Sequence, residues 1–266
     1  MAQNPYRLEA AQALARALAA LDPAAPPTAR LLRAPRAGLG QRVGVLPGSF
    51  DPLTTAHAAL ARAALRHGGI DSLLFLLSVR TVDKEGRACA ALADRALVLQ
   101  RYIAARPRYG LVVCNRGLYV EEAEALAALL PAGAAVWFVV GYDKIVQVFD
   151  PRYYPDREAA LTRLFQRAGF LVAPRGPAGP RELAALLARP ENQPYRERVR
   201  YLPLPPAYRD LSATAVRAAL AAGADPRGLV PAAVAAFITA TGCYRAGAAA
   251  DAYAARRQAL ALPRAS

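Results

Sequence analysis

Cysteines and long apolar runs are both scarce in this sequence. Its 266 residues include three cysteines, Cys89, Cys114 and Cys243, which lie far apart and show no Cys-x-x-Cys spacing. A sparse, odd set without metal-ligand spacing suits a reducing cytoplasm. No stretch approaches the roughly 20 apolar residues that span a bilayer, and the N-terminus lacks the apolar core of a signal peptide. We therefore expect a cytoplasmic protein without a membrane partner and without a protein metal site.

Lysine is the scarcest of the charged residues. The net charge is +14, yet only Lys84 and Lys144 among the cationic side chains are lysines. Arginine suffices elsewhere, so these two positions either mark sites that need a compact ammonium or persist by chance. The sequence contains no basic block and no basic run interleaved with aromatic residues. We expect the charge to attract small anionic substrates, and we do not expect nucleic acid as the principal ligand.

From Arg42 onward, strand and helix signals alternate along the chain. The segment 72–77 is an almost continuous apolar run, as expected for a strand covered on both faces. The helix predicted over 55–67 follows a strand at 42–46 and ends at Gly68-Gly69. Alternation of this kind predicts an α/β fold, a Rossmann-like doubly wound parallel sheet with helices on both faces. Further strands are predicted at 111–114, 135–140, 170–173 and 199–204.

Composition divides the chain into three parts. Residues 1–40 contain a helical pattern over 5–21 and then a segment rich in proline and glycine, which predicts a linker over 24–40. Residues 41–245 hold the alternating elements and form the main domain. Residues 246–266 are predicted to be a loosely helical, basic tail.

The first predicted strand runs into Pro47-Gly48-Ser49-Phe50-Asp51-Pro52. In a doubly wound sheet, ligands bind beyond the carboxyl ends of the strands, near the point where the strand order reverses. Gly48 lets the backbone approach a phosphate, and the helix that begins near Thr55 points its free N–H groups at the same place. Thr54 and His57, three residues apart, can both project toward that ligand. A tight turn with an ordinary helix cap is the simpler interpretation of the same residues.

A second strand-to-helix junction carries Leu211-Ser212-Ala213-Thr214-Ala215-Val216-Arg217. Ser212 or Thr214 can cap the coming helix, and Arg217 lies three residues past Thr214 on the same face. Hydroxyls, free N–H groups and a guanidinium suit the outer phosphates of a nucleotide. Taken alone, this is a common way to begin a helix.

Together, the two motifs resemble a known family. Residues 48–57 resemble the G-(S/T)-F-(D/N)-P-x-(H/T)-x-x-H signature of the nucleotidyltransferase superfamily, and 211–217 resemble its (I/L)-S-(S/A)-T-x-x-R signature. Within it, the chain looks like the nicotinamide and nicotinate mononucleotide adenylyltransferases, over roughly 42–245. Thr54 stands where many bacterial members have histidine, and Ala56 where glycine is usual. A threonine at position 54 resembles the branch typified by eukaryotic nicotinamide mononucleotide enzymes. The resemblance therefore does not decide between nicotinamide and nicotinate as the substrate.

The resemblance also implies roles for individual residues. Val139-Val140-Gly141-Tyr142-Asp143 looks like the family's G-x-D, where Asp143 accepts from ribose hydroxyls; its simpler role is a helix cap. The catalytic residues implied are His57, Thr54 and Arg217. The ATP-binding residues implied are Gly48, Ser49, Phe50, His57, Gly141, Asp143, Ser212, Thr214 and Arg217. The acceptor-binding residues implied are Lys84, Asp94 and Arg95, for which a solvated charge is the alternative.

No aromatic residue stands out as a stacking platform for a pyridine ring. Tyr119, Tyr142 and Tyr153 are candidates, whereas Trp137 lies inside a predicted strand and is expected in the core. Residues 144–154 are similar to a stretch in a fungal and bacterial sub-branch of the family.

The implied reaction moves AMP from ATP to a mononucleotide acceptor, with release of pyrophosphate. Catalysis then depends on positioning and charge neutralisation, and Mg²⁺ binds mainly through the phosphates of ATP. Three alternatives stay open: phosphopantetheine as the acceptor, a CTP-dependent transfer, or a non-catalytic nucleotide-binding protein on the same scaffold. The sequence leaves a homo-oligomer open as well.

Overall fold

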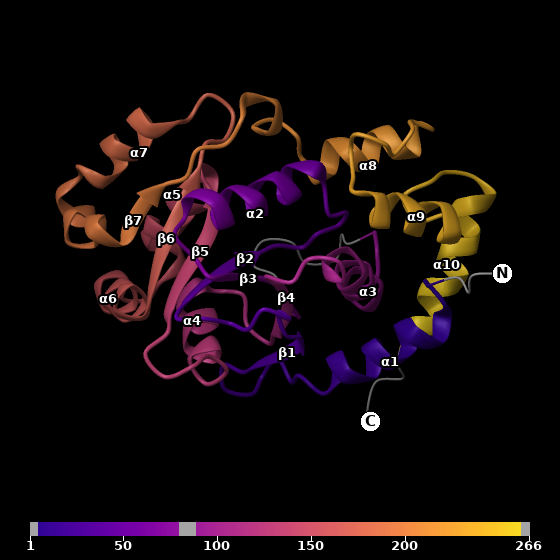
Figure 1. Ribbon diagram of the computed structural model, residues 1–266, viewed down its shortest axis with the longest axis horizontal. Helices are drawn as coiled ribbons and strands as arrows, with labels where there is room; N and C mark the ends of the chain where they lie inside the picture. The colour runs from indigo at the N-terminus through magenta and orange to yellow at the C-terminus, as the bar shows by residue number, and fades with distance from the viewer. Residues whose placement is uncertain (1–4, 80–88, 262–266) are drawn as a thin grey trace.

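A computed structural model describes residues 5–79 and 89–261 of the chain. Seven strands form one sheet in the order β1-β4-β3-β2-β5-β6-β7 (Figure 1). Strands β2 to β7 run parallel to their neighbours, and β1 pairs antiparallel with β4. The strands are β1 (Ala29–Arg33), β2 (Arg42–Pro47), β3 (Ser72–Ser78), β4 (Tyr109–Cys114), β5 (Ala135–Gly141), β6 (Ala168–Ala173) and β7 (Val199–Tyr201).

The strand order is that of a doubly wound sheet. From β2 the chain moves outward to β3 and β4, then returns to place β5 on the other side of β2 and continues to β6 and β7. Val43 of β2 is paired with Ser72 of β3 on one side and with Val136 of β5 on the other. The order therefore reverses between β2 and β5, which is where such sheets bind their ligands. The predicted Rossmann-like fold is confirmed.

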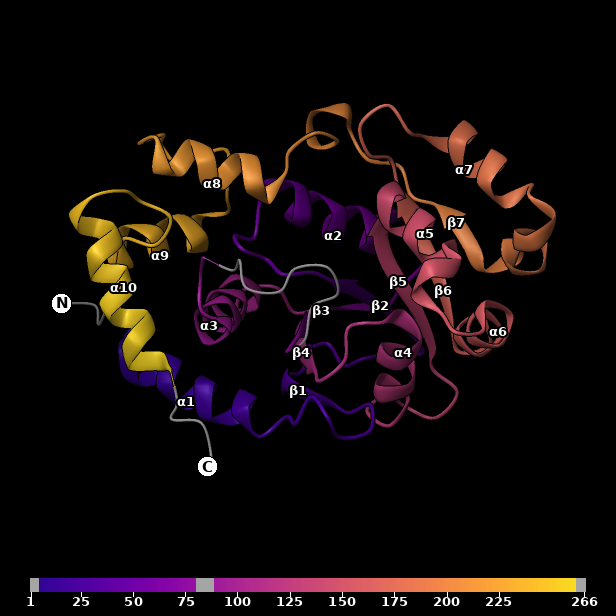
Figure 2. The same ribbon diagram turned by 180° about the vertical axis from the view of Figure 1, so that it is seen from behind.

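Helices cover both faces of the sheet (Figures 1 and 2). The face that we call the α2 face is covered by α1 (Leu8–Ala19), α2 (Thr55–His67), α3 (Leu92–Ile103), α8 (Ala213–Ala221), α9 (Ala232–Thr241) and α10 (Ala248–Leu260). The opposite α4 face is covered by α4 (Tyr119–Ala127), α5 (Tyr142–Phe149), α6 (Arg157–Arg167) and α7 (Pro180–Leu187). Short 3-10 helices lie at Pro151–Tyr153, Pro190–Arg198 and Pro206–Tyr208.

Each strand contributes side chains to both apolar layers. In β3, Phe75 and Leu77 pack toward the α2 face, and Leu74 and Leu76 pack toward the α4 face. All four side chains are fully buried. Burial on both sides explains why this strand reads as a continuous apolar run rather than as an alternation of apolar and polar residues.

The linker predicted over 24–40 is wrong for its central part. Residues 29–33 form β1, in which Ala29 pairs with Cys114 and Arg30 with Val113. The side-chain amide of Asn115 donates to the carbonyls of residues 22, 25 and 26, and its oxygen accepts from the N–H of Thr28. These bonds fix the chain just before β1. The neighbouring prolines and glycines concealed a short edge strand whose partner lies about 80 residues away.

The N-terminal and C-terminal helices lie side by side on the α2 face. Helix α1 packs against α3 and α10, and both α1 and α10 contribute buried side chains to the same apolar layer. The segment predicted as a loosely helical, basic tail therefore contains a packed helix, with Tyr253 and Leu260 buried. Within the ranges 5–79 and 89–261, no helix combines the length and apolarity that crossing a membrane requires.

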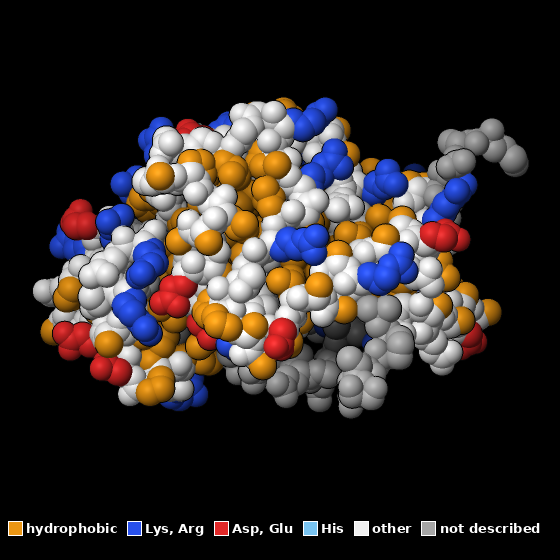
Figure 3. Space-filling view, turned by 90° about the horizontal axis from the view of Figure 1, so that it is seen from below, with side chains coloured by type: hydrophobic (Ala, Val, Ile, Leu, Met, Phe, Trp, Pro, Cys, Tyr) orange, Lys and Arg blue, Asp and Glu red, His pale blue; other side chains and the backbone are white. Residues whose placement is uncertain are grey.

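Charged side chains are dispersed over the face of the molecule shown in Figure 3. Arginine and lysine side chains there lie among acidic and apolar ones and do not gather into a single block. On this face the charges do not form the continuous basic stripe that a nucleic-acid backbone requires.

Candidate active site

The loop after β2 has a tightly constrained backbone. Phe50 has a φ of 45°, in the left-handed region that a bulky residue rarely adopts. Its buried ring packs edge-on against Phe75 and His57, with ring centroids 5.4 and 5.3 Å away. A Cβ atom on Gly48 would lie 2.9 Å from the Phe50 ring. Glycine is therefore needed at position 48, and the Phe50 side chain belongs to the core, so only the backbone of Phe50 is available to a nucleotide.

Asp51 holds this loop in place. Its carboxylate is 3% exposed and accepts from the N–H groups of Cys89 and Ala90, at 2.8 and 3.0 Å, and from the Tyr244 hydroxyl, at 2.8 Å. Two of these donors begin the segment that leads into α3, and the third follows α9. Asp51 therefore joins the loop after β2 to two distant parts of the chain.

Thr54 and His57 form a reciprocal cap at the start of α2. The Thr54 hydroxyl accepts from the N–H of His57, and the N–H of Thr54 donates to His57 Nδ1 at 3.1 Å. Because Nδ1 accepts this hydrogen bond, the neutral imidazole carries its own proton on Nε2. Thr54 is fully buried. The structure gives Thr54 a role in orienting His57, and its predicted direct contact with the phosphates stays a prediction.

The second motif begins α8 and reaches the first one. Ser212 caps this helix by accepting from the N–H of Ala215 at 3.0 Å. Arg217 donates from Nη1 to the Asp51 carbonyl at 2.6 Å and from Nη2 to the Thr214 hydroxyl at 3.2 Å. The guanidinium is half-buried, with 26% of the side chain exposed. The beginnings of α2 and α8 therefore meet, as both views of the ribbon show (Figures 1 and 2).

The third nucleotide-binding segment ends β5, next to β2. Gly141 begins α5 without a side-chain cap, and a Cβ atom there would lie 2.8 Å from Asp143 Oδ1. Asp143 is exposed in the first turn of α5. Because β5 is paired with β2, Asp143 and the loop after β2 lie at the same edge of the sheet. Asp143 thus lies at the ligand-binding edge of the sheet, and its predicted contact with ribose hydroxyls stays a prediction.

The structure changes the interpretation of the predicted acceptor residues. Lys84 lies outside the described residues. Asp94 is fully buried, and its carboxylate accepts from the guanidinium of Arg256 and from the Tyr253 hydroxyl. The Asp94 oxygens are turned toward the C-terminal helix, and the predicted contact of Asp94 with the acceptor stays a prediction.

Arg95 contacts the loop after β2 from α3. Its Nη1 donates to the Ser49 carbonyl at 2.7 Å, and the residue is 9% exposed. Burial lowers the pKa of Arg95, and the nearby Asp51 carboxylate opposes this shift. The structure gives Arg95 a role in shaping the loop, and its predicted contact with an acceptor stays a prediction.

The aromatic candidates have different environments. Tyr119 packs edge-on against Phe138 and Phe170, with ring centroids 5.1 and 5.5 Å away. The Tyr142 hydroxyl donates to the carbonyl of Glu182, and the Tyr153 hydroxyl accepts from Gln147. Trp137 is buried, as predicted, at 7% exposure. Tyr119 is partly buried and packs against the core of the α4 face, and the structure does not single out Tyr142 or Tyr153 as a stacking platform.

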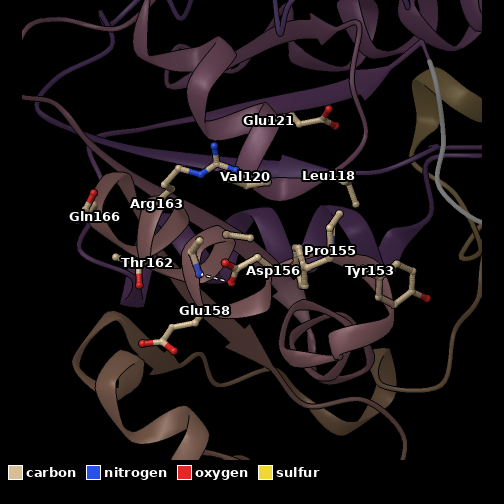
Figure 4. A pocket seen from close by; sticks show the side chains of 13 residues that line it. Leu118, Val120, Glu121, Tyr153, Pro155, Asp156, Glu158, Thr162, Arg163 and Gln166 are labelled. Carbon is tan, nitrogen blue, oxygen red and sulfur yellow. Dashed lines mark hydrogen bonds between the residues drawn. The ribbon is translucent and has the colours of Figure 1, made fainter.

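A hollow of about 820 Å³ lies between α4 and α6 on the α4 face (Figure 4). Its walls come from Leu118, Val120 and Glu121, from 153–156, and from the length of α6 as far as Gln166. None of its lining residues belongs to either motif. Although it is a spacious depression, this hollow is not the place where the two motifs meet, and size alone is a poor guide to the site.

The carboxylates around the two motifs do not form a metal cage. Across the described part of the chain, no group of three or more His, Cys, Asp and Glu side chains is arranged to hold a metal ion. Asp51 already accepts three hydrogen bonds, and Asp143 is exposed. This donor set fits a Mg²⁺ ion that keeps much of its water and is held through a nucleotide's phosphates.

Sequence reasoning missed three residues that shape the site. Asp51 lies within the first motif, so its position was visible although its role was not. Tyr244 reaches Asp51 across 193 residues, and Arg175, after β6, donates to the Leu211 carbonyl at 3.4 Å. No local pattern marks such partners, because both act through contacts that only the fold creates.

Comparison with known proteins agrees with this geometry. The cytidylyltransferase-like family matches residues 45–219, which include both motifs. Two curated relatives are named probable nicotinate-nucleotide adenylyltransferase. The one from Bordetella pertussis is 32% identical over 207 residues, covering 77% of this chain and 98% of that protein. The one from Laribacter hongkongensis is 33% identical over 214 residues, covering 76% and 94%.

Among solved structures, a similar fold occurs in the Plasmodium falciparum nicotinic acid mononucleotide adenylyltransferase complexed with APC. The TM-score is 0.54, with 14% sequence identity, and the match covers 77% of this chain and 98% of that one. At this identity the likeness concerns the fold alone. The family match, by contrast, spans most of the sheet and both helix beginnings that Arg217 brings together. The chain belongs to the cytidylyltransferase-like family of nucleotidyltransferases and is related, within it, to the nicotinate-nucleotide adenylyltransferases.

Proposed function

We propose that this protein transfers the AMP part of ATP to a pyridine mononucleotide, nicotinate or nicotinamide mononucleotide, in NAD synthesis. An oxygen of the acceptor phosphate attacks the α-phosphorus of ATP, the bond between the α-phosphorus and the bridging oxygen breaks, and pyrophosphate leaves. No residue of the protein is modified covalently. The names of the relatives support this reaction class.

One observation carries the proposal. Arg217 donates to the Asp51 carbonyl at 2.6 Å across 166 residues of chain, so the loop after β2 and the start of α8 form one site. The N-termini of α2 and α8 then lie at the same site, where the positive ends of their helix dipoles favour a polyphosphate. A single anion would need only one of them.

Different side chains contact different parts of the two substrates. His57, fixed with its proton on Nε2, donates to phosphate oxygens near the α-phosphorus. Ser212, Thr214 and Arg217 hold the departing pyrophosphate, and the backbone of residues 48–50 lies along the nucleotide. Asp143 accepts from the ribose. Thr54 acts through His57, and Lys84 is proposed for the acceptor phosphate.

Mg²⁺ is the cofactor that we propose. When bound to the phosphates it neutralises charge that accumulates on the leaving pyrophosphate. The exposed Asp143 carboxylate would approach such an ion or its water shell. The other residues of the site hold and orient the nucleotide.

The test is incubation of the protein with ATP, Mg²⁺ and each mononucleotide, followed by chromatography of the products. We expect a dinucleotide and an equal amount of pyrophosphate. Parallel reactions with phosphopantetheine, and with CTP plus phosphocholine or a phosphosugar, separate the alternative acceptors. Absence of pyrophosphate with every acceptor would indicate a non-catalytic nucleotide-binding protein.

A further inference from the structure

The terminal helices lie outside the part of the chain that the family matches. The match spans 45–219, whereas α1 ends at Ala19 and α10 begins at Ala248. The two helices pack against each other, and α1 packs against α3. Arg256 of α10 also donates to the Tyr6 carbonyl, and the Tyr6 hydroxyl donates to the carbonyl of Ala233. These additions therefore form a connected layer over α3 and α9.

A buried polar cluster joins this layer to the start of α3. Asp94, in the first turn of α3, is fully buried and accepts from Arg256 Nε and Nη2. The closest contact of this ion pair is 2.6 Å, and the Arg256 side chain is 12% exposed. The Tyr253 hydroxyl donates to Asp94 at 2.9 Å and accepts from the N–H of Ala91 at 3.0 Å. Ala91 is the N-cap residue of α3 and has no side chain that can cap it. Helix α10 thus provides an acceptor for one of the otherwise unpaired N–H groups at the start of α3.

The start of α3 in turn holds the loop after β2. Three consecutive N–H groups are bound here: those of Cys89 and Ala90 donate to the Asp51 carboxylate, and that of Ala91 donates to Tyr253. One residue after Asp94, Arg95 donates to the Ser49 carbonyl. A continuous set of hydrogen bonds therefore runs from Arg256 and Tyr253 through residues 89–95 to Ser49 and Asp51.

We propose that Tyr253 and Arg256 are positioning residues for the phosphate site, and that α10 holds the loop at Ser49–Asp51 in the conformation that binds nucleotide. Neither side chain touches substrate. They act by fixing the start of α3, and a displacement of about 1 Å at a reacting centre is enough to reduce turnover by about 100-fold. The part of this inference that concerns turnover rests on the proposed function.

The test compares full-length Tyr253→Phe and Arg256→Gln with the unsubstituted protein. Tyr253→Phe keeps the ring against Phe237, where the centroids lie 6.3 Å apart, and removes only the hydroxyl. At a temperature at which every variant is folded, we expect about a 10-fold loss of kcat/KM for ATP. We also expect faster amide hydrogen exchange in peptides covering 49–51 and 89–91.

Matched controls separate positioning from general stability. Tyr201→Phe removes an exposed hydroxyl, and Arg257→Gln removes an exposed charge from the residue next to Arg256. Both controls should keep the kinetics and hydrogen exchange of the unsubstituted protein. If Tyr253→Phe and Arg256→Gln lower Tm but leave kcat, KM and exchange at 49–51 unchanged, α10 is only a stabilising element and the proposal is wrong.

The outcome stays decidable if the proposed reaction fails. Binding of a non-hydrolysable ATP analogue, measured by calorimetry, reports on the loop without any acceptor. A protein that binds the analogue but releases no pyrophosphate refutes the proposed function, while a weaker Kd in Tyr253→Phe still supports positioning. If the analogue does not bind at all, unchanged exchange at 49–51 in Tyr253→Phe refutes the positioning role.

Discussion

Buried carboxylates on the two faces of the sheet differ in the number of hydrogen bonds that they accept. On the α2 face, the carboxylates of Asp51 and Asp94 each accept at least three hydrogen bonds. On the α4 face, Glu122 is 2% exposed and accepts one hydrogen bond, from the Ser78 hydroxyl at 2.8 Å. Its Oε2 has no hydrogen-bond partner among the residues that the structure describes. Burial raises the pKa of Glu122 to about 7.

This difference follows the location of the two motifs. The first motif's loop and α8 belong to the α2 face, where the carboxylates of Asp51 and Asp94 are each fixed by several partners. The α4 face has an aromatic cluster around Phe138 and Phe170, whose centroids lie 5.4 Å apart. We therefore expect substitutions on the α2 face to change turnover more than stability, and substitutions on the α4 face to do the opposite.

Replacement of His57 is expected to cause the largest loss of turnover among the substitutions on the α2 face. We expect His57→Ala to reduce kcat by roughly 100-fold or more, because it removes one preorganised donor to the transition state. The measurement is the rate of pyrophosphate release at saturating ATP, with folding checked by circular dichroism. His67→Ala, in the last turn of the same helix, is the matched control and should retain normal turnover. Near-normal turnover in folded His57→Ala would remove His57 from the mechanism.

Replacement of Glu122 tests the α4 face through its pH dependence. The pKa of this carboxyl is about 7 in the folded protein, against 4.5 for the unperturbed group. Between these values the folded state retains a proton that the unfolded state has lost, so the free energy of unfolding falls as pH rises. A difference of roughly 2.5 units corresponds to at most about 3 kcal/mol, reached above pH 7.

Glu122→Gln removes this ionisation and keeps a neutral acceptor for Ser78. We expect the variant to be more stable than the unsubstituted protein at pH 8, by up to about 3 kcal/mol, and equally stable near pH 4. Urea unfolding at both values of pH measures the difference, and turnover should change little. A large loss of turnover in a stabilised Glu122→Gln would instead indicate that this carboxyl takes part in the reaction. The expectation that substitutions on the α4 face change stability more than turnover would then be wrong.

The fold was predictable from the sequence because its signals are local. The helix predicted over 55–67 has those bounds in the structure, and the strands predicted at 72–77 and 135–140 extend by one residue each. Strand β1 was missed because a five-residue edge strand between prolines and glycines has too few residues to show a period. Its position depends on pairing with β4, which no local pattern contains.

The two motifs of the site could be predicted from the sequence, but the hydrogen bonds and ion pairs of their residues could not. The two motifs are contiguous strings, so His57 and Arg217 could be named without a structure. For Thr54, however, the sequence does not show that its hydroxyl caps α2. For Asp94, it does not show the ion pair with Arg256, which lies 162 residues away. Spacing shows which residues share a helix face and does not show which of them the fold buries.

Replacement of Arg217 by lysine is the subtlest test of the contrast. Arginine reaches the Asp51 carbonyl and the Thr214 hydroxyl with two nitrogens of one planar group. A single ammonium cannot occupy both positions, although it keeps the charge. We expect Arg217→Lys to lose about 10-fold in kcat/KM for ATP, equivalent to about 1.4 kcal/mol, with little change in Tm.

Arg227→Lys is the matched control, since Arg227 is exposed and pairs only locally with Asp225 among the described contacts. It should leave both turnover and Tm unchanged. If Arg217→Lys keeps full turnover and lowers Tm, then Arg217 serves only to tie α8 to the loop after β2. In that case Arg217 would contribute to stability alone. Of the residues tested on the α2 face, His57 alone would then affect turnover. Retained charge with lost turnover would show instead that the geometry of the guanidinium, and not its charge alone, joins the two motifs into one phosphate site.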